Sequence, residues 1–142
     1  MKTVAQLLRA KPHGVLSVPP DTAVYRALQL MAERNVGALL VLDGETLVGI
    51  FSERDYARKV ILVGKSSKET AVREIMSSHV LYVRPDQTIE DCMALMTDKR
   101  VRHLPVFDGE KLVGVVSIGD VVKAIIAEQS FVIEQLQNYI RS

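Results

Sequence analysis

Two serine and aspartate pairs stand at positions suited to binding a phosphorylated ligand. Ser52 precedes Asp55 and Ser117 precedes Asp120 by three residues, each time directly after a short apolar run. Free backbone amides at the start of a helix attract phosphate, and a carboxylate can accept hydrogen bonds from two neighbouring sugar hydroxyls. The same spacing is also an ordinary capping box, in which both side chains serve only the helix end. The pattern by itself leaves both interpretations open.

Cations flank both pairs. Arg54, Arg58 and Lys59 follow Ser52, and Arg102 precedes the second apolar run. An arginine can contact phosphate through two parallel hydrogen bonds, and Gly119, without a side chain, lets a ligand approach closely. The alternative is that the first three cations form a solvated face together with an acidic neighbour.

Other chemistry finds little support. The single cysteine, Cys92, excludes an internal disulfide and any zinc site with several cysteines, and its place on an apolar helical stripe predicts a buried, inert thiol. His103 has no cysteine or second histidine at ligand spacing, so we expect no metal site. Without paired carboxylates, a nucleophile with a base, or a Walker loop, we expect no catalytic residues.

Composition limits the class of protein further. The chain has 142 residues, 48% of them apolar, and a formal net charge of +1, which predicts a packed core without a charge field for nucleic acid or membrane. Neither a secretory signal nor a membrane span is expected, and the lone cysteine fits a reducing compartment. We therefore expect a cytoplasmic protein.

An internal duplication organises the chain. Shifted by 65 residues, 18–55 aligns with 83–120 without a gap, so that Leu30 falls on Leu95 and Leu47 on Leu112. Upstream, 4–8 resembles 72–76 at an offset of 68, and each half is expected to begin with a short lead-in helix. We expect one repeat over 1–68 and another, with a long C-terminal helix, over 69–142, joined by the polar stretch 65–69.

Each repeat predicts the order β-α-β-β-α. Residues 20–22, and Thr88 with Asp91, are helix starts followed by apolar residues at helical spacing. Asp-Gly pairs at 43–44 and 108–109 separate apolar runs and predict hairpins. Ser52 and Ser117 each begin a second helix, which runs to residue 63 in the first repeat and far beyond 127 in the second. The expected fold class is α/β (α+β), with the repeats packed around a pseudo-twofold axis and clefts between them.

Two stretches carry a resemblance to a known family. The sequence RHLPVFDG at 102–109 leads into the second hairpin and GVVSIGD at 114–120 leads out of it, and GIFSERD at 49–55 repeats this exit. The chain resembles the CBS-domain family, in which two repeats form a Bateman module, and the resemblance covers nearly its whole length. The stretches 51–60 and 64–67 are also similar to stand-alone two-CBS proteins of bacteria and plant organelles.

The resemblance implies an adenosine-type ligand in the clefts and no catalytic cofactor. The resemblance implies ligands such as AMP, ADP or ATP, and sometimes NAD or S-adenosylmethionine. The two aspartates would hold ribose hydroxyls, the two serines would lie near phosphate, and backbone around the first strands with residues before the second strand would enclose the base. The nucleotide-binding residues expected are Val18, Ser52, Arg54, Asp55, Arg58, Val83, Arg102, His103, Leu104, Pro105, Ser117, Gly119 and Asp120.

The first repeat departs from the family pattern. Gly37, Ala38 and Leu40 stand where the second repeat has arginine, histidine and proline, which puts equal occupancy of the two clefts in doubt. The expected function is a regulatory sensor that binds an adenine nucleotide and signals its occupancy to a separate, unknown effector protein. The alternatives are a ligand-free structural dimerisation module and a nucleotide-hydrolysing enzyme.

An apolar stripe on the C-terminal helix predicts a homodimer. Apolar residues at helical spacing continue through 121–126 and then through 131–140, and a module of this size has little left to cover them. CBS modules that resemble this chain pair through their helices with twofold symmetry. The alternative is that the C-terminal helix folds back on its own chain.

Overall fold

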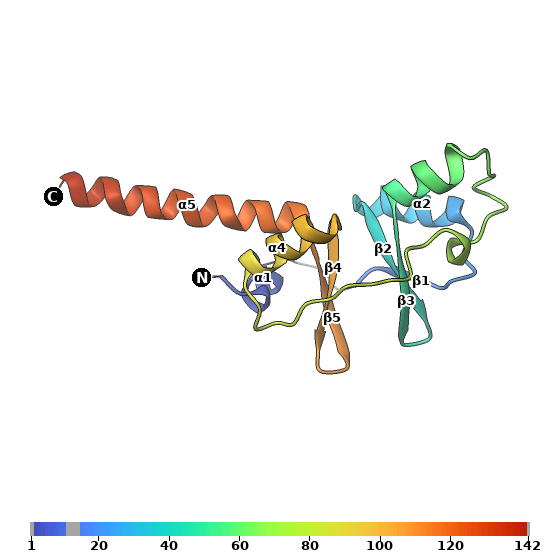
Figure 1. The fold of residues 1–142 in the computed structure, drawn as a ribbon, viewed down its shortest axis with the longest axis horizontal. Coiled ribbons are helices and arrows are strands. Elements are labelled where there is room, and N and C mark those ends of the chain that lie inside the picture. The colour runs from blue at the N-terminus through green and yellow to red at the C-terminus, as the bar shows by residue number, and fades with distance from the viewer. Residues whose placement is uncertain (1, 11–14, 142) are drawn as a thin grey trace. The chain divides into compact units, whose positions relative to one another are not determined.

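The computed structural model describes residues 2–10 and 15–141 (Figure 1). These residues form two compact units. One comprises Val15–Val80 and is called the 15–80 unit; the other combines α1 (Val4–Ala10) with the chain from Leu81 onward and is called the 81–141 unit. Each unit contains one hairpin, the helices around it and its own apolar core.

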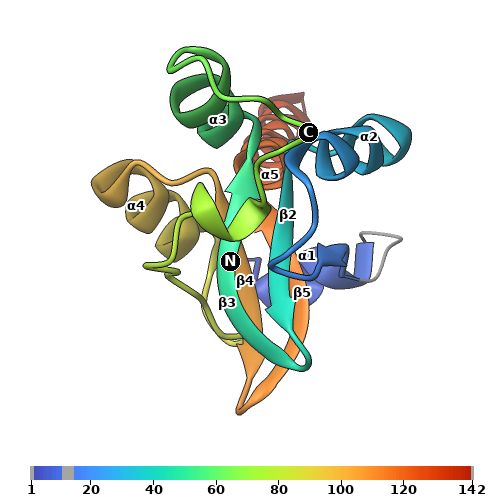
Figure 2. The ribbon, with the colours of Figure 1, turned by 90° about the vertical axis from the view of Figure 1, so that its right-hand side faces the viewer.

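The 15–80 unit is built on a three-stranded sheet in the order β1-β2-β3, and Figure 2 labels the hairpin strands β2 and β3. Strand β1 (Ser17–Val18) runs parallel to β2 (Ala38–Asp43), which pairs antiparallel with β3 (Thr46–Ser52). The helices are α2 (Val24–Arg34) and α3 (Glu53–Tyr56), the latter continuing as a π-helical turn, η1 (Ala57–Ile61). This confirms the predicted hairpin and element order for the first repeat.

The 81–141 unit repeats the plan around a two-stranded sheet. Strands β4 (His103–Asp108) and β5 (Lys111–Ser117) form the hairpin, preceded by α4 (Ile89–Lys99) and followed by α5 (Ile118–Arg141). The predicted first strand is reduced to one parallel bridge between Val83 and Val106. The long C-terminal helix is confirmed.

Glycine fixes both hairpin turns. Gly44 has φ +64° and Gly109 has φ +63°, and each is the first central residue of a two-residue loop. Glycine adopts a positive φ at that position without steric strain, and such turns match the twist of the flanking strands. This is why an Asp-Gly pair between apolar runs identified both hairpins correctly.

The lead-in segments are exchanged between the repeats. Val4 and Leu7 of α1 are buried in the core of the 81–141 unit, while Val72 and Ile75, in and just after the 3₁₀ turn η2 (Val72–Glu74), are buried in the core of the 15–80 unit. Each segment therefore packs on the hairpin of the other repeat, so the compact units do not coincide with the sequence repeats. The second lead-in is a single turn, not the short helix expected.

Equivalent glycines make room for the exchanged segments. A Cβ atom on Gly114 would lie 2.8 Å from Leu8 Cδ2, and one on Gly49 would lie 2.5 Å from Met76 Sδ and 3.0 Å from the Ser77 carbonyl oxygen. Strand β3 also bonds to this segment, because Ile50 and Ser77 exchange two backbone hydrogen bonds of 2.9 Å. Only a residue without a side chain permits such an approach.

Helix α2 begins beside the predicted start but is capped differently. Its N-cap residue, Ala23, offers no side-chain hydrogen bond. Instead, the amides of Val24 and Tyr25 donate to the carbonyls of Thr70 and Ser67, both over 2.8 Å. The capping expected from residues 20–22 was wrong at this point, because the connector supplies the acceptors from more than forty residues further along the chain.

Candidate functional site

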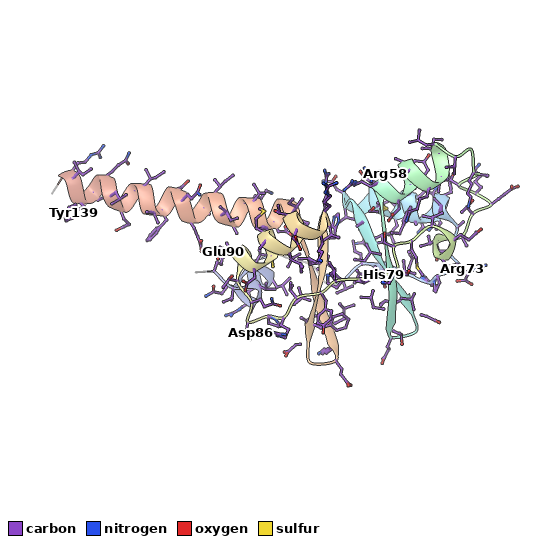
Figure 3. The ribbon with its side chains drawn as sticks, in the orientation of Figure 1. Arg58, Arg73, His79, Asp86, Glu90 and Tyr139 are labelled. Carbon is purple, nitrogen blue, oxygen red and sulfur yellow. The ribbon has the colours of Figure 1, made fainter. Side chains whose placement is uncertain are left out.

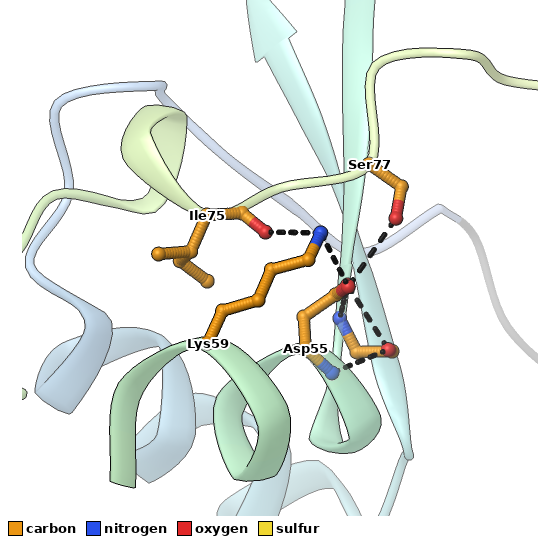
Figure 4. Close-up of polar contacts among 5 residues, drawn as sticks. Asp55, Lys59, Ile75 and Ser77 are labelled. Carbon is orange, nitrogen blue, oxygen red and sulfur yellow. Dashed lines mark hydrogen bonds and ion pairs between the residues drawn. The ribbon is translucent and has the colours of Figure 1, made fainter. Parts of the chain in front are cut away.

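The first Ser-x-x-Asp pair forms a complete capping box at the junction of β3 and α3 (Figure 4). Asp55 Oδ2 accepts from the Ser52 amide over 2.9 Å and from Ser52 Oγ over 3.0 Å, and the Asp55 amide donates to Ser52 Oγ over 3.2 Å. The Glu53 amide donates to the carbonyl of Gly37 over 3.1 Å, which ties the start of α3 to the entry of β2.

Long-range partners occupy the other oxygen of Asp55 (Figure 4). Asp55 Oδ1 accepts from Ser77 Oγ over 3.2 Å and lies 3.2 Å from Lys59 Nζ, which also donates to the Ile75 carbonyl over 3.1 Å. The carboxylate is therefore held on both oxygens and is only 8% exposed. Asp55 thus links α3 to the exchanged segment that contains η2 and Ser77. The ammonium group of Lys59 points toward Asp55.

The second Ser-x-x-Asp pair stands at the start of α5, the longest helix in the described residues. The Ser117 amide donates to Asp120 Oδ2 over 2.9 Å, and the Asp120 amide donates to Ser117 Oγ over 3.1 Å. The Ile118 amide donates to the Arg102 carbonyl over 2.8 Å, as Glu53 does to Gly37. Asp120 is more exposed than Asp55.

The two aspartates differ in their surroundings. Four residues after Asp120 stands Ala124, a buried small residue, where the first repeat has Lys59. The Asp55 carboxylate thus has a cation from its own helix, whereas that position beside Asp120 carries no charge. The N-terminal end of α5 therefore presents a serine, a half-buried carboxylate and Gly119 with its Cα exposed to solvent.

The remaining predicted site residues fall into two groups. Arg58 and Arg102 are exposed and Arg54 and His103 are half-buried, so all four side chains have access to solvent (Figure 3 labels Arg58). Pro105 is buried, and its carbonyl accepts from the Val83 amide over 3.0 Å.

Three other residues on the predicted list are core residues. Val18 is 6% exposed, and Val83 and Leu104 are fully buried in their cores. Their side chains serve packing, and only their backbone is suited to a ligand. For Val18 and Val83 the resemblance implies a contact through the backbone, which leaves their side chains to the core.

The thiol of Cys92 is buried, as predicted. Burial, with smaller contributions from the charges of Asp91 and Glu90, raises the pKa of this thiol from 9.0 to about 11. Because the thiolate is the reactive form, this environment disfavours a nucleophilic role. Across the described residues no group of three or more histidine, cysteine or acidic side chains is placed to hold a metal ion.

The structure contains a cavity that the sequence analysis did not predict. A cavity of about 520 Å³ in the 15–80 unit lies where β1 ends and the β2–β3 hairpin turns, and Asp21, Asp43 and Arg73 line it together with Pro19 and Pro20. Ser52 pairs with Ala38 at the opposite end of the same hairpin. The cavity is therefore separate from the Ser-x-x-Asp motif, and no sequence pattern marked it because Arg73 reaches it from the exchanged segment.

Comparison with known proteins agrees with this architecture. The CBS-domain family profile matches residues 4–62 and 72–127. The chain belongs to the CBS-domain family, and the predicted family and fold class are confirmed.

Its relatives include other CBS-domain proteins. The chain is 43% identical to the Arabidopsis thaliana CBS domain-containing protein CBSX3, mitochondrial, over 98% of this chain and 72% of the relative. A solved structure of a protein with CBS domains from Burkholderia ambifaria is 56% identical, with a TM-score of 0.87, over 90% of this chain and 96% of that one. A structure of CBSX2 in complex with AMP is 28% identical, with a TM-score of 0.71, over 89% and 98%. No helix among the described residues is both long and apolar enough to cross a bilayer.

Proposed function

We propose that this chain is a regulatory sensor that binds an adenine nucleotide, AMP foremost, with ADP, ATP and NAD as further candidates. The observation that carries the proposal is the start of α5. There Ser117, Asp120 and Gly119 combine a helix N-terminus suited to phosphate with a half-buried carboxylate suited to ribose hydroxyls. The AMP bound in the CBSX2 structure supports the class of ligand.

The second repeat provides the main contact in this proposal. Asp55 is 8% exposed and is held by Ser77 and Lys59 as well as by its own capping box, so a ribose would have to displace existing partners. Asp120 is more accessible; Arg102 precedes its hairpin, and His103 is the first residue of β4. This is consistent with the departure of the first repeat from the family pattern.

The expected affinity is micromolar. A nucleotide of about two dozen heavy atoms, at roughly 0.3 kcal/mol per atom, gains about 7 kcal/mol, which corresponds to a dissociation constant on the order of 10 μM.

The test compares two aspartates that cap helices in the same way. Asp91 forms with Thr88 a capping box like that of Asp120, with distances of 3.0 and 3.1 Å, in the same unit. If Asp120 holds ribose, Asp120→Ala lowers the calorimetric affinity for AMP by at least about ten-fold, and Asp91→Ala leaves it unchanged. Equal affinities in both variants, with similar losses of stability, would show that Asp120 is only a cap.

The wider role follows from the family and the exposed helix. We propose that the protein acts as a homodimer through the exposed apolar side chains of α5 and passes nucleotide occupancy to a separate effector protein. We place it in the cytoplasm on the evidence of its single buried cysteine, although the name of the Arabidopsis relative assigns that protein to mitochondria. Turnover of ATP on prolonged incubation would instead favour an enzyme.

A further inference from the structure

Eight apolar residues of α5 have the same spacing in both directions from Gln129, and the exposed Phe131 and Tyr139 lie outside this set. Apolar side chains stand 3, 4, 7 and 11 residues before it and again 3, 4, 7 and 11 residues after it. We call this set the α5 stripe. Its members are Ile118, Val122, Ile125, Ile126, Val132, Ile133, Leu136 and Ile140.

The α5 stripe is turned away from the core of its own unit except at Ile125, which packs partly against that core. Val121 and Ala124 are the buried residues of the helix, whereas Ile126 and Ile133 of the stripe are each 56% exposed and Ile140 is 80% exposed. Spacings of three and four residues keep the stripe on one side of the helix. Figure 1 shows α5 extending beyond α1 and α4 of its unit, so its C-terminal half has no cover from that unit.

A symmetric spacing is what two identical helices need in order to pair in opposite directions. A twofold axis through Gln129 would place Ile118 opposite Ile140 and Val122 opposite Leu136 of the second copy. Ile125 and Ile126 would then meet Ile133 and Val132. Every apolar position meets an apolar position, and the contact is self-complementary, as a twofold interface requires.

The charges beside the stripe favour the same direction. Lys123 lies six residues before Gln129 and Glu134 five residues after it, and helical spacing puts both on the same flank of the stripe. Antiparallel pairing brings Lys123 opposite Glu134 of the second copy, offset by one residue or about 1.5 Å of helix rise. In a parallel pair in register, the same flank of the two helices lies on opposite sides of the contact, so Lys123 and Glu134 would not meet.

We propose that α5 pairs antiparallel with α5 of a second copy in the register centred on Gln129. This rests on the proposed homodimer and adds its direction and its contacts. Arg141 lies twelve residues after the centre and Ser117 twelve before it. Arg141 of each copy therefore ends level with the start of α5 of the other copy.

Disulfide trapping tests the direction. Val122→Cys and Leu136→Cys are made separately in a Cys92→Ala background, and nucleotide-free protein is first shown to be dimeric by sedimentation. Under mild oxidation each variant alone should stay uncrosslinked, whereas a subunit-exchanged mixture should form a covalent dimer. Crosslinking of Val122→Cys with itself, or no crosslinking of the mixture, would overturn the register. A monomer would overturn the proposed dimer itself, whatever the nucleotide affinity.

Charge reversal supplies a matched control. Lys123→Glu and Glu134→Lys should each weaken the dimer by about ten-fold, since each places like charges opposite one another at two symmetric positions. The double variant should return to within about two-fold of the original dissociation constant. A double variant as weak as the two single losses combined would refute the Lys123–Glu134 pairing.

Discussion

Replacing Asp55 with alanine should destabilise the nucleotide-free protein far more than the loss of one helix cap. The carboxylate closes the capping box with Ser52, accepts from Ser77 Oγ over 3.2 Å and lies 3.2 Å from Lys59 Nζ. Asp55→Ala removes all of these interactions together. It also removes the side-chain connection between α3 and the segment after η2.

The expected loss is about 3 kcal/mol. A capping box is worth about 1 kcal/mol, and the hydrogen bonds from Ser52 Oγ and Ser77 Oγ to a charged acceptor together add about 1.5 kcal/mol, because part of their strength is recovered from water. The ion pair with Lys59 adds about 0.5 kcal/mol, since the lysine side chain is 45% exposed. The Asp55 side chain is 10% exposed, so water competes little for these contacts in the folded protein.

Urea unfolding of nucleotide-free protein measures this loss, and Asp91→Ala is the matched control. The control removes the capping box that Thr88 forms with Asp91, and we expect it to cost about 1 kcal/mol. Ser77→Ala should cost about 1 kcal/mol and have little further effect on top of Asp55→Ala. An Asp55→Ala loss no larger than that of Asp91→Ala would refute the claim that Asp55 fastens the exchanged segment.

Three further outcomes follow from buried contacts. Gly49→Ala should lower the free energy of unfolding in urea by about 1–3 kcal/mol, and by more than Gly114→Ala does. A Cβ atom at position 49 meets a backbone oxygen as well as a side chain, whereas one at position 114 meets only the side chain of Leu8. Equal losses in the two variants would contradict this prediction. The Cys92 thiol should react slowly with a thiol reagent at pH 8, since its pKa is raised to about 11. Because the folded pKa exceeds the unfolded one, the stability contributed by the neutral thiol is complete below pH 9 and is lost between pH 9 and 11. The stability difference from Cys92→Ala should therefore change across that range, and a constant difference would contradict the raised pKa.

The sequence by itself determined the local features of this protein. The duplication, both hairpins and the capping boxes of Ser52 with Asp55, Thr88 with Asp91 and Ser117 with Asp120 could all be predicted. These features depend on contacts between residues a few positions apart, where backbone geometry alone determines which residues are in contact. The same regularity made the family and the candidate aspartates recognisable.

Only the tertiary structure decided which surfaces meet. Asp55 and Ser77 are 22 residues apart, and nothing in their spacing predicts their hydrogen bond. The exchange of α1 and η2, the capping of α2 by the connector and the cavity beside Arg73 share this origin. Identical apolar patterns in two repeats suit either hairpin equally well, so the pattern cannot say which lead-in packs on which sheet. Which lead-in segment packs on which hairpin is decided by the close approach at Gly49 and Gly114 and by the burial of particular side chains. Both kinds of contact exist only in the folded chain.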